Sequence, residues 1–429
     1  MHPSAHRRSF TRTTILASSV SLALLVLVGV SFCLPAWNAG HRLLPAGVAW
    51  LVVAAVVAGS ALLGAYAALV ALGGIVVLYR SAREERGLPY VPDRPRERIT
   101  GPLLLAFRRF LKPGARLVPG ELAEVRSLPE ILATLDERGC LDGLPFMPEM
   151  VAYCGHRFPV HRRVDKVWEY AHNTGLRRFH DAVLLKTLRC SGQSHGGCQA
   201  SCQLIWKEAW LRPAGTVEAP APTSARPIDL GAHTQTVVEG KQRFVCQMTE
   251  IVRAAPQTLR MWNLGHYWRD LITGNVRLMP LLVAVGIRLF NGMQWRLRGS
   301  LWPIIQTTDS DASPQQDLGL QPGQLVRVKS KRDIEATLNR KRRNRGLELG
   351  QDQLFCCGGS YRVYARVTNI VHEGTGELLV LKTPSILLEG ANANGGTLLT
   401  PQNEFFFWRE IWLEPQPSSE DATATTPAT

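Results

Sequence analysis

The pattern of hydrophobic residues divides the chain into an apolar N-terminal part and a longer part of mixed polarity. Two uncharged runs, residues 15–37 and 43–79, fill most of the N-terminal part and are separated by a short polar link. A membrane-spanning helix needs about 20 apolar residues, so the first run predicts one span. The second run predicts either one tilted span or two short spans that turn near AGSALLGA. We therefore expect a transmembrane α-hairpin over residues 1–80.

Positive charges flank these apolar runs. Three arginines precede the first run and six follow the second, from Arg80 to Arg98, whereas Arg42 is the only one between them. The positive-inside rule then predicts a multi-pass protein of the bacterial inner membrane whose soluble region is cytoplasmic. A twin-arginine export signal is one alternative, but paired arginines before a span are more often topology charge. A cleaved secretory signal is the other, and the second apolar run disfavours it.

Beyond the apolar part, the sequence repeats itself. LVPGELAEVRSLPEILATLDERGCLDGLPFMPEMVAYCG (residues 117–155) aligns with LQPGQLVRVKSKRDIEATLNRKRRNRGLELGQDQLFCCG (residues 320–358) at a constant offset of 203, which places Cys154 on Cys357. After a slip of one residue, WKEAWLRP aligns with WREIWLEP. A register kept over this length predicts two copies of one module.

Each module is predicted to be mainly β. PGELAEV and PGQLVRV are turns followed by alternating apolar residues, which is typical of a strand, and HRFPVHRRV, YRVYARV, AVLLKTL and SILLEG have strand length. SLPEILATLD and KRDIEATLN each predict one short helix. On a strand, WKEAW and WREIW would place their tryptophans on one face and their charges partly on the other. We expect two tandem small β-barrel-like repeats with an α-helical segment between them.

The remaining segments complete the predicted domain plan. The modules occupy residues 117–213 and 320–415, after a basic juxtamembrane amphipathic segment at 81–116; linkers lie at 214–240 and 307–319, and a disordered tail at 416–429. Residues 241–306 are predicted to be helical. Their apolar stretch, LMPLLVAVGIRLF, is too short to span and is interrupted by Arg288. We favour a helix on the membrane surface, anchored by Trp295 and Trp302, over a buried core helix.

Candidate chemistry centres on the loop RCSGQSHGGCQASC in the first module. The candidate metal ligands are Cys154, Cys190, Cys198, Cys202 and His195. Four such groups suit zinc, or alternatively an iron–sulfur cluster, and the loop's glycines permit the tight turns that gather ligands. A reduced cysteine loop and a catalytic thiol with His195 or His180 as its base stay open. The second module has Ala393 in place of Cys190, so its fold does not require this site.

The middle segment offers a possible second site. Cys246 and Glu250 are spaced i, i+4, as are His266 and Asp270. On helices each pair would share a face and could contribute to a metal or acid–base constellation. We favour a hydrogen-bonded pair for His266 and Asp270.

The net charge of +14 favours anionic partners. The densest basic run comprises Arg340, Lys341, Arg342, Arg343 and Arg345. Next to a membrane, anionic lipid explains this run more simply than nucleic acid does, because the run lacks interleaved aromatic residues.

GLPFMPEMVAYCGHRFPVHRRVDK, RCSGQSHGGCQASCQLIWKEAWLRP and WREIWLEP resemble an uncharacterised bacterial membrane-anchored family of hypothetical proteins. The resemblance covers both modules and the segment between them, and it implies a place beside polysaccharide or natural-product biosynthesis genes. This chain has Val167 after Lys166 where the family carries a cysteine, which argues against an essential full set of thiols.

These features favour a non-catalytic, metal-binding accessory or scaffold protein at the membrane, with protein partners of unknown identity. The alternative is a membrane-bound iron–sulfur or thiol-dependent redox enzyme, and nucleic-acid binding is a weaker third. The sequence contains no phosphate-binding glycine loop, nucleophile elbow or HExxH motif.

Overall fold

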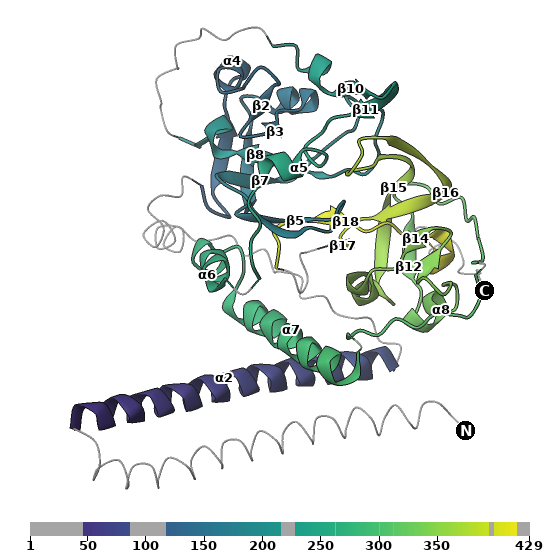
Figure 1. The fold of residues 1–429 in the computed structure, drawn as a ribbon. Coiled ribbons are helices and arrows are strands. Elements are labelled where there is room, and N and C mark those ends of the chain that lie inside the picture. The colour runs from purple at the N-terminus through teal and green to yellow at the C-terminus, as the bar shows by residue number, and fades with distance from the viewer. Residues whose placement is uncertain are drawn as a thin grey trace, which may run out of the picture. The chain divides into compact units, whose positions relative to one another are not determined.

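A computed structural model describes residues 46–85, 117–215 and 228–417, apart from residues 262, 300, 312 and 394–398 (Figure 1). The chain divides into two compact units. One comprises Met1–Leu88 and Leu278–Ile304, and the other Pro89–Arg277 and Ile305–Thr429. We call them the helical unit and the β unit, and each is described by itself.

The helical unit contains two long apolar helices. α2 (Ala46–Glu85) is one continuous helix, so the second apolar run does not turn back on itself, while the span predicted at 15–37 lies outside the described residues. α7 (Leu278–Arg298) has 21 residues and extends beyond the stretch LMPLLVAVGIRLF, so the prediction that this part of the chain is too short to span was wrong about its length. Segments of both helices, Ala58–Arg83 and Leu278–Leu297, are long and apolar enough to cross a membrane.

Small residues let the two helices approach closely. A Cβ atom added to Gly73 would lie 2.2 Å from the carbonyl oxygen of Gly286, so the backbones are in contact there. Val70, Val77 and Phe290 are buried beside this contact. Larger residues at either glycine would force the helices apart.

The β unit contains two curled half-barrel sheets. The first has the order β8-β7-β4-β1-β9 and consists of β1 (Leu122–Val125), β4 (Arg157–Arg163), β7 (Ala182–Arg189), β8 (Gln203–Lys207) and β9 (Leu211–Pro213). Its neighbours are antiparallel throughout. The connections form α4 (Leu128–Leu132), β2 (Cys140–Leu141), β3 (Leu144–Pro145), η1 (Pro148–Tyr153), β5 (Lys166–Glu169), β6 (Gly175–Arg178) and η2 (Glu208–Trp210), where η marks a 3₁₀-helix.

The second half-barrel has the order β16-β15-β12-β19 and consists of β12 (Leu325–Val328), β15 (Ser360–Val371), β16 (Leu378–Leu388) and β19 (Leu413–Pro415). Its connections form α8 (Lys331–Glu335), β13 (Arg343–Asn344), β14 (Leu347–Glu348), η4 (Gln351–Cys356), β17 (Asn392–Ala393), β18 (Glu404–Phe405) and η6 (Glu410–Trp412). The two short helices predicted from the sequence correspond to α4 and α8.

The segment between the sheets is less helical than the sequence indicated. It contains η3 (Gly231–His233), β10 (Gln235–Val238), β11 (Lys241–Phe244), α5 (Ile251–Ala254) and α6 (Leu264–Thr273) before α7. The hairpin of β10 and β11 lies across residue 240, where the sequence predicted the end of a linker.

The pairing registers of the two sheets correspond. Leu122 pairs with Pro159 in the first sheet, and Leu325 pairs with Arg362 in the second, at the offset of the internal alignment. The pairing of Val183 with Trp206 likewise recurs as an isolated bridge between Ile386 and Trp408, which agrees with the alignment and its later slip of one position.

Each sheet curls around a core that includes two buried tryptophans. Trp206 and Trp210 are fully buried in the first core, and Trp408 and Trp412 are fully buried in the second. The prediction that the intervening charges lie partly on the face opposite the tryptophans assumed one strand, but the strand ends at Lys207 and a 3₁₀-turn follows. Those charges are buried as well.

Candidate metal centre

The candidate site is built by one 3₁₀-helix and one loop of the first half-barrel. Glu149 lies in the first turn of η1. Cys190 directly follows β7, and His195 lies in the loop that leads to β8. The backbone N–H of Cys190 donates to the carbonyl of Cys202 at 2.8 Å, which closes the base of this loop. We call residues 190–202 the cysteine loop.

Gly192 sets the path of the cysteine loop. Its φ angle is +69°, and an added Cβ would lie 1.8 Å from the carbonyl oxygen of Cys198. The N–H groups of His195 and Gly197 both donate to the Gly192 carbonyl, at 3.1 and 3.0 Å. Only glycine fits this turn, and the turn brings His195 back towards Cys190.

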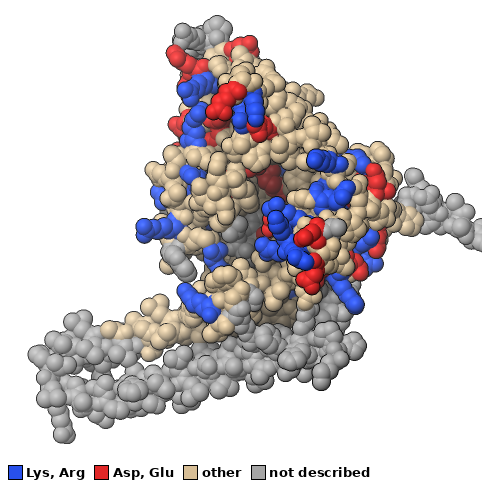
Figure 2. All heavy atoms as spheres, turned by 45° about the vertical axis from the view of Figure 1, so that its right-hand side comes forward, with Lys and Arg blue, Asp and Glu red and all other residues tan. Residues whose placement is uncertain are grey.

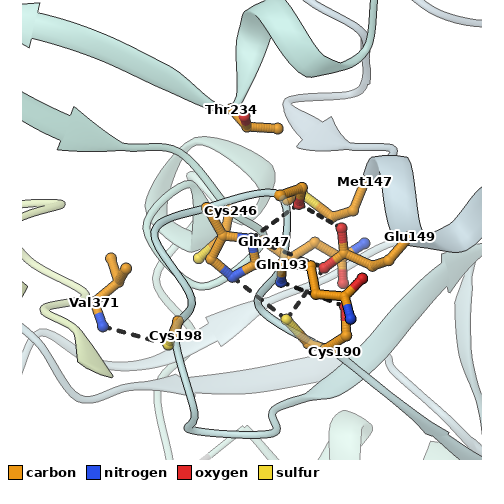
Figure 3. Close-up of polar contacts among 12 residues, drawn as sticks. Met147, Glu149, Cys190, Gln193, Cys198, Thr234, Cys246, Gln247 and Val371 are labelled. Atoms are coloured by element: carbon orange, nitrogen blue, oxygen red, sulfur yellow. Dashed lines mark hydrogen bonds and ion pairs between the residues drawn. The ribbon is translucent and has the colours of Figure 1, made fainter. Parts of the chain in front are cut away.

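Three side chains that could bind a metal ion converge at this turn, Glu149, Cys190 and His195, and Figure 3 labels the first two. Cys190 Sγ lies 3.3 Å from Glu149 Oε1 and 3.4 Å from His195 Nε2. The ligand atoms of these three residues all lie within 4.8 Å of one another. For comparison, tetrahedral zinc with ordinary Zn–S and Zn–N bonds holds its ligand atoms about 3.5 Å apart. The observed separations fit a shared ion.

A serine orients two of the three groups. Ser194 Oγ donates to Glu149 Oε2 at 2.5 Å and lies 3.1 Å from His195 Nδ1. His195 is 1% exposed, so its ring position is fixed by packing as well as by these contacts. Such contacts to ligand side chains hold metal sites in the correct geometry.

The electrostatics of the site disfavour charge on its thiol and imidazole. Burial raises the pKa of the Cys190 thiol far above its usual range, and the Glu149 carboxylate beside it raises it further. Burial also lowers the pKa of His195. A divalent cation would reverse this balance at Cys190, because it stabilises thiolate and carboxylate and binds neutral imidazole.

Of the predicted ligands, the structure brings together only Cys190 and His195. The thiol of Cys198 points to the second half-barrel, where its sulfur accepts the N–H of Val371 at 3.3 Å. Cys202 lies at the other end of the loop, and Cys154 follows η1. Among the described residues, the cluster within 4.8 Å therefore contains one cysteine rather than four.

The sequence interpretation did not identify Glu149. The internal alignment holds a signal for it, because Asp352 occupies the corresponding position of the second module. Because both modules have a carboxylate at this position, Glu149 could have been included among the candidate ligands.

The possible second site separates into two parts. Glu250 donates its N–H to the carbonyl of Cys246 in a turn, and among the described residues no close cluster of metal-ligating groups combines this pair with His266 and Asp270. Asp270 instead forms a buried ion pair with Lys166 at 2.5 Å, and Lys166 Nζ lies 3.2 Å from His266 Nδ1. Burial and the Lys166 charge lower the pKa of His266 to about 4. This arrangement anchors α6 to β5.

The basic run carries nearby acidic partners. Arg342 and Arg343 each lie 3.5 Å from the carboxylate of Glu348, and Arg340 lies 4.0 Å from Asp311. On the face shown in Figure 2, basic and acidic side chains are likewise interspersed. The run is exposed but partly neutralised.

Comparisons with known proteins do not assign this site, since no family model, no curated protein and no solved structure matches the chain.

Proposed function

We propose that this protein is a membrane-anchored, metal-binding accessory or scaffold protein, and that Glu149, Cys190 and His195 hold a divalent metal ion. The observation that carries this proposal is the convergence of three different ligand types within 4.8 Å. A mixed S, N and O set suits zinc, and three protein ligands leave a position open for water or another molecule.

The helical unit supports the membrane anchor. α2 contains the segment Ala58–Arg83, which is long and apolar enough to cross a membrane. The residues before and after α7 belong to the same compact unit, which a crossing helix would divide between the two sides of the membrane. This favours α7 as a helix with both of its ends on one side of the membrane. With the span proposed at 15–37, the anchor would be a hairpin with a cytoplasmic β unit.

The accessory role is supported by the two half-barrels. Their matching registers favour the inference that they are copies of one module. The second copy has lost the thiol of the site, and binding surfaces tolerate such divergence more easily than active sites. Partners in polysaccharide or natural-product biosynthesis are part of the proposal through the family resemblance alone, and contact of the basic run with anionic lipid is a further part.

A thiol-dependent enzyme is the second candidate. Cys190 Sγ lies 3.4 Å from His195 Nε2, and His195 Nδ1 lies 3.8 Å from Glu149 Oε1, which is the order of nucleophile, base and carboxylate in thiol enzymes. Against this, Cys190 also faces Glu149 directly, and that carboxylate raises the pKa of the thiol. The thiolate that a nucleophile needs is therefore disfavoured.

The test uses the full-length chain, purified in detergent without oxygen. Elemental analysis should find about one zinc per chain, and Cys190→Ala should lose it, because a tetrahedral site cannot do without its thiolate. Cys154→Ala is the matched control and should retain the metal. If the wild-type chain instead holds iron and sulfide, and both variants lose them, the four-cysteine cluster would be established. A wild-type chain without metal would refute the metal-binding proposal.

A further inference from the structure

The second half-barrel forms hydrogen bonds to the cysteine loop of the first. Gln199 donates its backbone N–H to the carbonyl of Asn369 on β15 at 3.0 Å. Its side-chain Oε1 accepts the N–H groups of Thr368 and Asn369, at 2.7 and 3.2 Å, and the Thr368 hydroxyl at 3.2 Å. Gln199 thus pairs with the backbone of β15 in the other half-barrel.

Backbone contacts link Gln199 and its neighbour Cys198 to the proposed ligand His195. The Cys198 carbonyl packs directly on the Cα of Gly192, so close that no Cβ fits between them. Gly192 in turn holds the backbone of His195 by a hydrogen bond of 3.1 Å. A displacement of Gln199 would therefore be transmitted through Cys198 and Gly192 to His195.

A second contact reaches the same loop by another path. The turn between β15 and β16 accepts the N–H of Phe244 through the carbonyl of Gly376, at 2.7 Å. The ring of Phe244 packs against Gly196, where an added Cβ would lie 2.8 Å from it. Two parts of one hairpin thus support the backbone on either side of Gly197.

The half-barrels also make the reciprocal contact, which carries no proposed ligand. Gln402, in the loop before β18, accepts the N–H of Trp168 at 2.8 Å and donates to its carbonyl at 3.1 Å. Each half-barrel therefore holds a strand of the other through a glutamine, but only Gln199 belongs to a loop with metal ligands.

We propose that the second half-barrel positions the metal-binding loop of the first, with Gln199 as the positioning residue. This inference rests on the proposed metal site at Glu149, Cys190 and His195. On this proposal, the second half-barrel increases the metal affinity of the site in the first half-barrel.

The test compares Gln199→Ala with Gln402→Ala in the full-length chain in detergent. Zinc affinity is measured by competition with a chromophoric chelator, and the thiolate-to-cobalt absorption of the Co²⁺-loaded protein reports ligand geometry. Gln199→Ala should weaken zinc binding about 10-fold or more and alter the cobalt spectrum, as changes behind metal ligands do. Gln402→Ala removes an equivalent contact and should leave both unchanged. Gln199→Glu keeps the acceptor oxygen and should restore most of the affinity.

Wild-type zinc affinity in Gln199→Ala, or equal weakening by both alanine variants, would overturn this inference while the metal site itself stands. Thermal unfolding of the metal-free variants identifies any loss that reflects unfolding. A wild-type chain that binds neither zinc nor cobalt would remove the proposed function, and this inference with it.

Discussion

In the first half-barrel, Arg163 forms a buried ion pair with Glu208; in the second, Arg366 forms the equivalent pair with Glu410. The tryptophans that follow these carboxylates also correspond, since Trp210 donates to Thr134 at 3.1 Å and Trp412 donates to Thr337 at 2.8 Å. The carboxylates and tryptophans of these shared contacts are buried in both half-barrels.

The two half-barrels differ where the proposed ligands lie. Asp352 stands where the first has Glu149, and Ala393 stands where it has Cys190. The second half-barrel nevertheless encloses a complete core with fully buried Trp408 and Trp412. The comparison teaches that the thiol is not needed for the fold, so the cysteine loop is free to serve a function.

The largest expected effect comes from the buried ion pairs. Glu208→Ala should lower the free energy of unfolding by about 3–5 kcal/mol, because it leaves the Arg163 guanidinium, 2% exposed, with Asp165 at 3.6 Å as its remaining carboxylate partner. Glu410→Ala should cost less, about 1–3 kcal/mol, since Arg366 is 27% exposed and reaches water. Urea unfolding of both variants measures the difference. Equal losses would contradict the view that the first pair is the more deeply buried.

Glu404, which takes the place of Cys202 in the second half-barrel, should make the free energy of unfolding depend on pH. Burial raises the pKa of Glu404 to about 7, although Arg189 opposes this shift. The folded state then binds the proton more tightly than the unfolded chain, so stability should fall as the pH rises from about 4.5 to 7. Glu404→Gln should remove roughly 2 kcal/mol of this fall.

Urea midpoints at about pH 4 and pH 8 measure this effect, because these two conditions lie on either side of the expected transition. Glu389→Gln, an exposed carboxylate of the same half-barrel, is the control and should leave the difference unchanged. A Glu404→Gln variant with the wild-type pH dependence would show that this carboxyl titrates in its usual range.

The smallest expected effect concerns a contact that both half-barrels share. Thr134→Val and Thr337→Val each remove the acceptor of a buried indole N–H and should each cost about 1 kcal/mol. Both hydroxyls also donate to a helix carbonyl at 2.7 Å, so the two sites match closely. Chemical denaturation should give the same loss for both. A clear inequality would mean that the two cores are less alike than their geometry suggests.

Alternation and turn residues were sufficient to predict a mainly β region, and the uncharged run at 43–79 was sufficient to predict α2. They were not sufficient for residues 235–244, because the hairpin of β10 and β11 has few apolar positions that alternate. They also did not predict that Lys207 and Glu208 of WKEAW are buried, because this burial depends on partners far away in the sequence. Lys207 pairs with Asp142, for example, 65 residues earlier.

The candidate site was predicted in part for the same reason. Cys190 and His195 are close in sequence, so local spacing was sufficient to group them. Glu149 lies 41 residues before Cys190, and only the packing of η1 against the end of β7 brings the two together. Spacing alone also grouped Cys198 with the ligands, but the Gly192 turn directs its thiol towards Val371.

The hydrogen bonds between Gln199 and β15 have a consequence for the order in which the site forms during translation. Its partner Thr368 lies 169 residues further along the chain, so a ribosome adding about 5–20 residues per second exposes the cysteine loop roughly 10–30 s before that partner exists. On this view the loop first emerges without its support, and firm capture of the ion comes only when the C-terminal half of the protein has been made and has docked. The nascent chain would then need its thiols kept reduced through that interval.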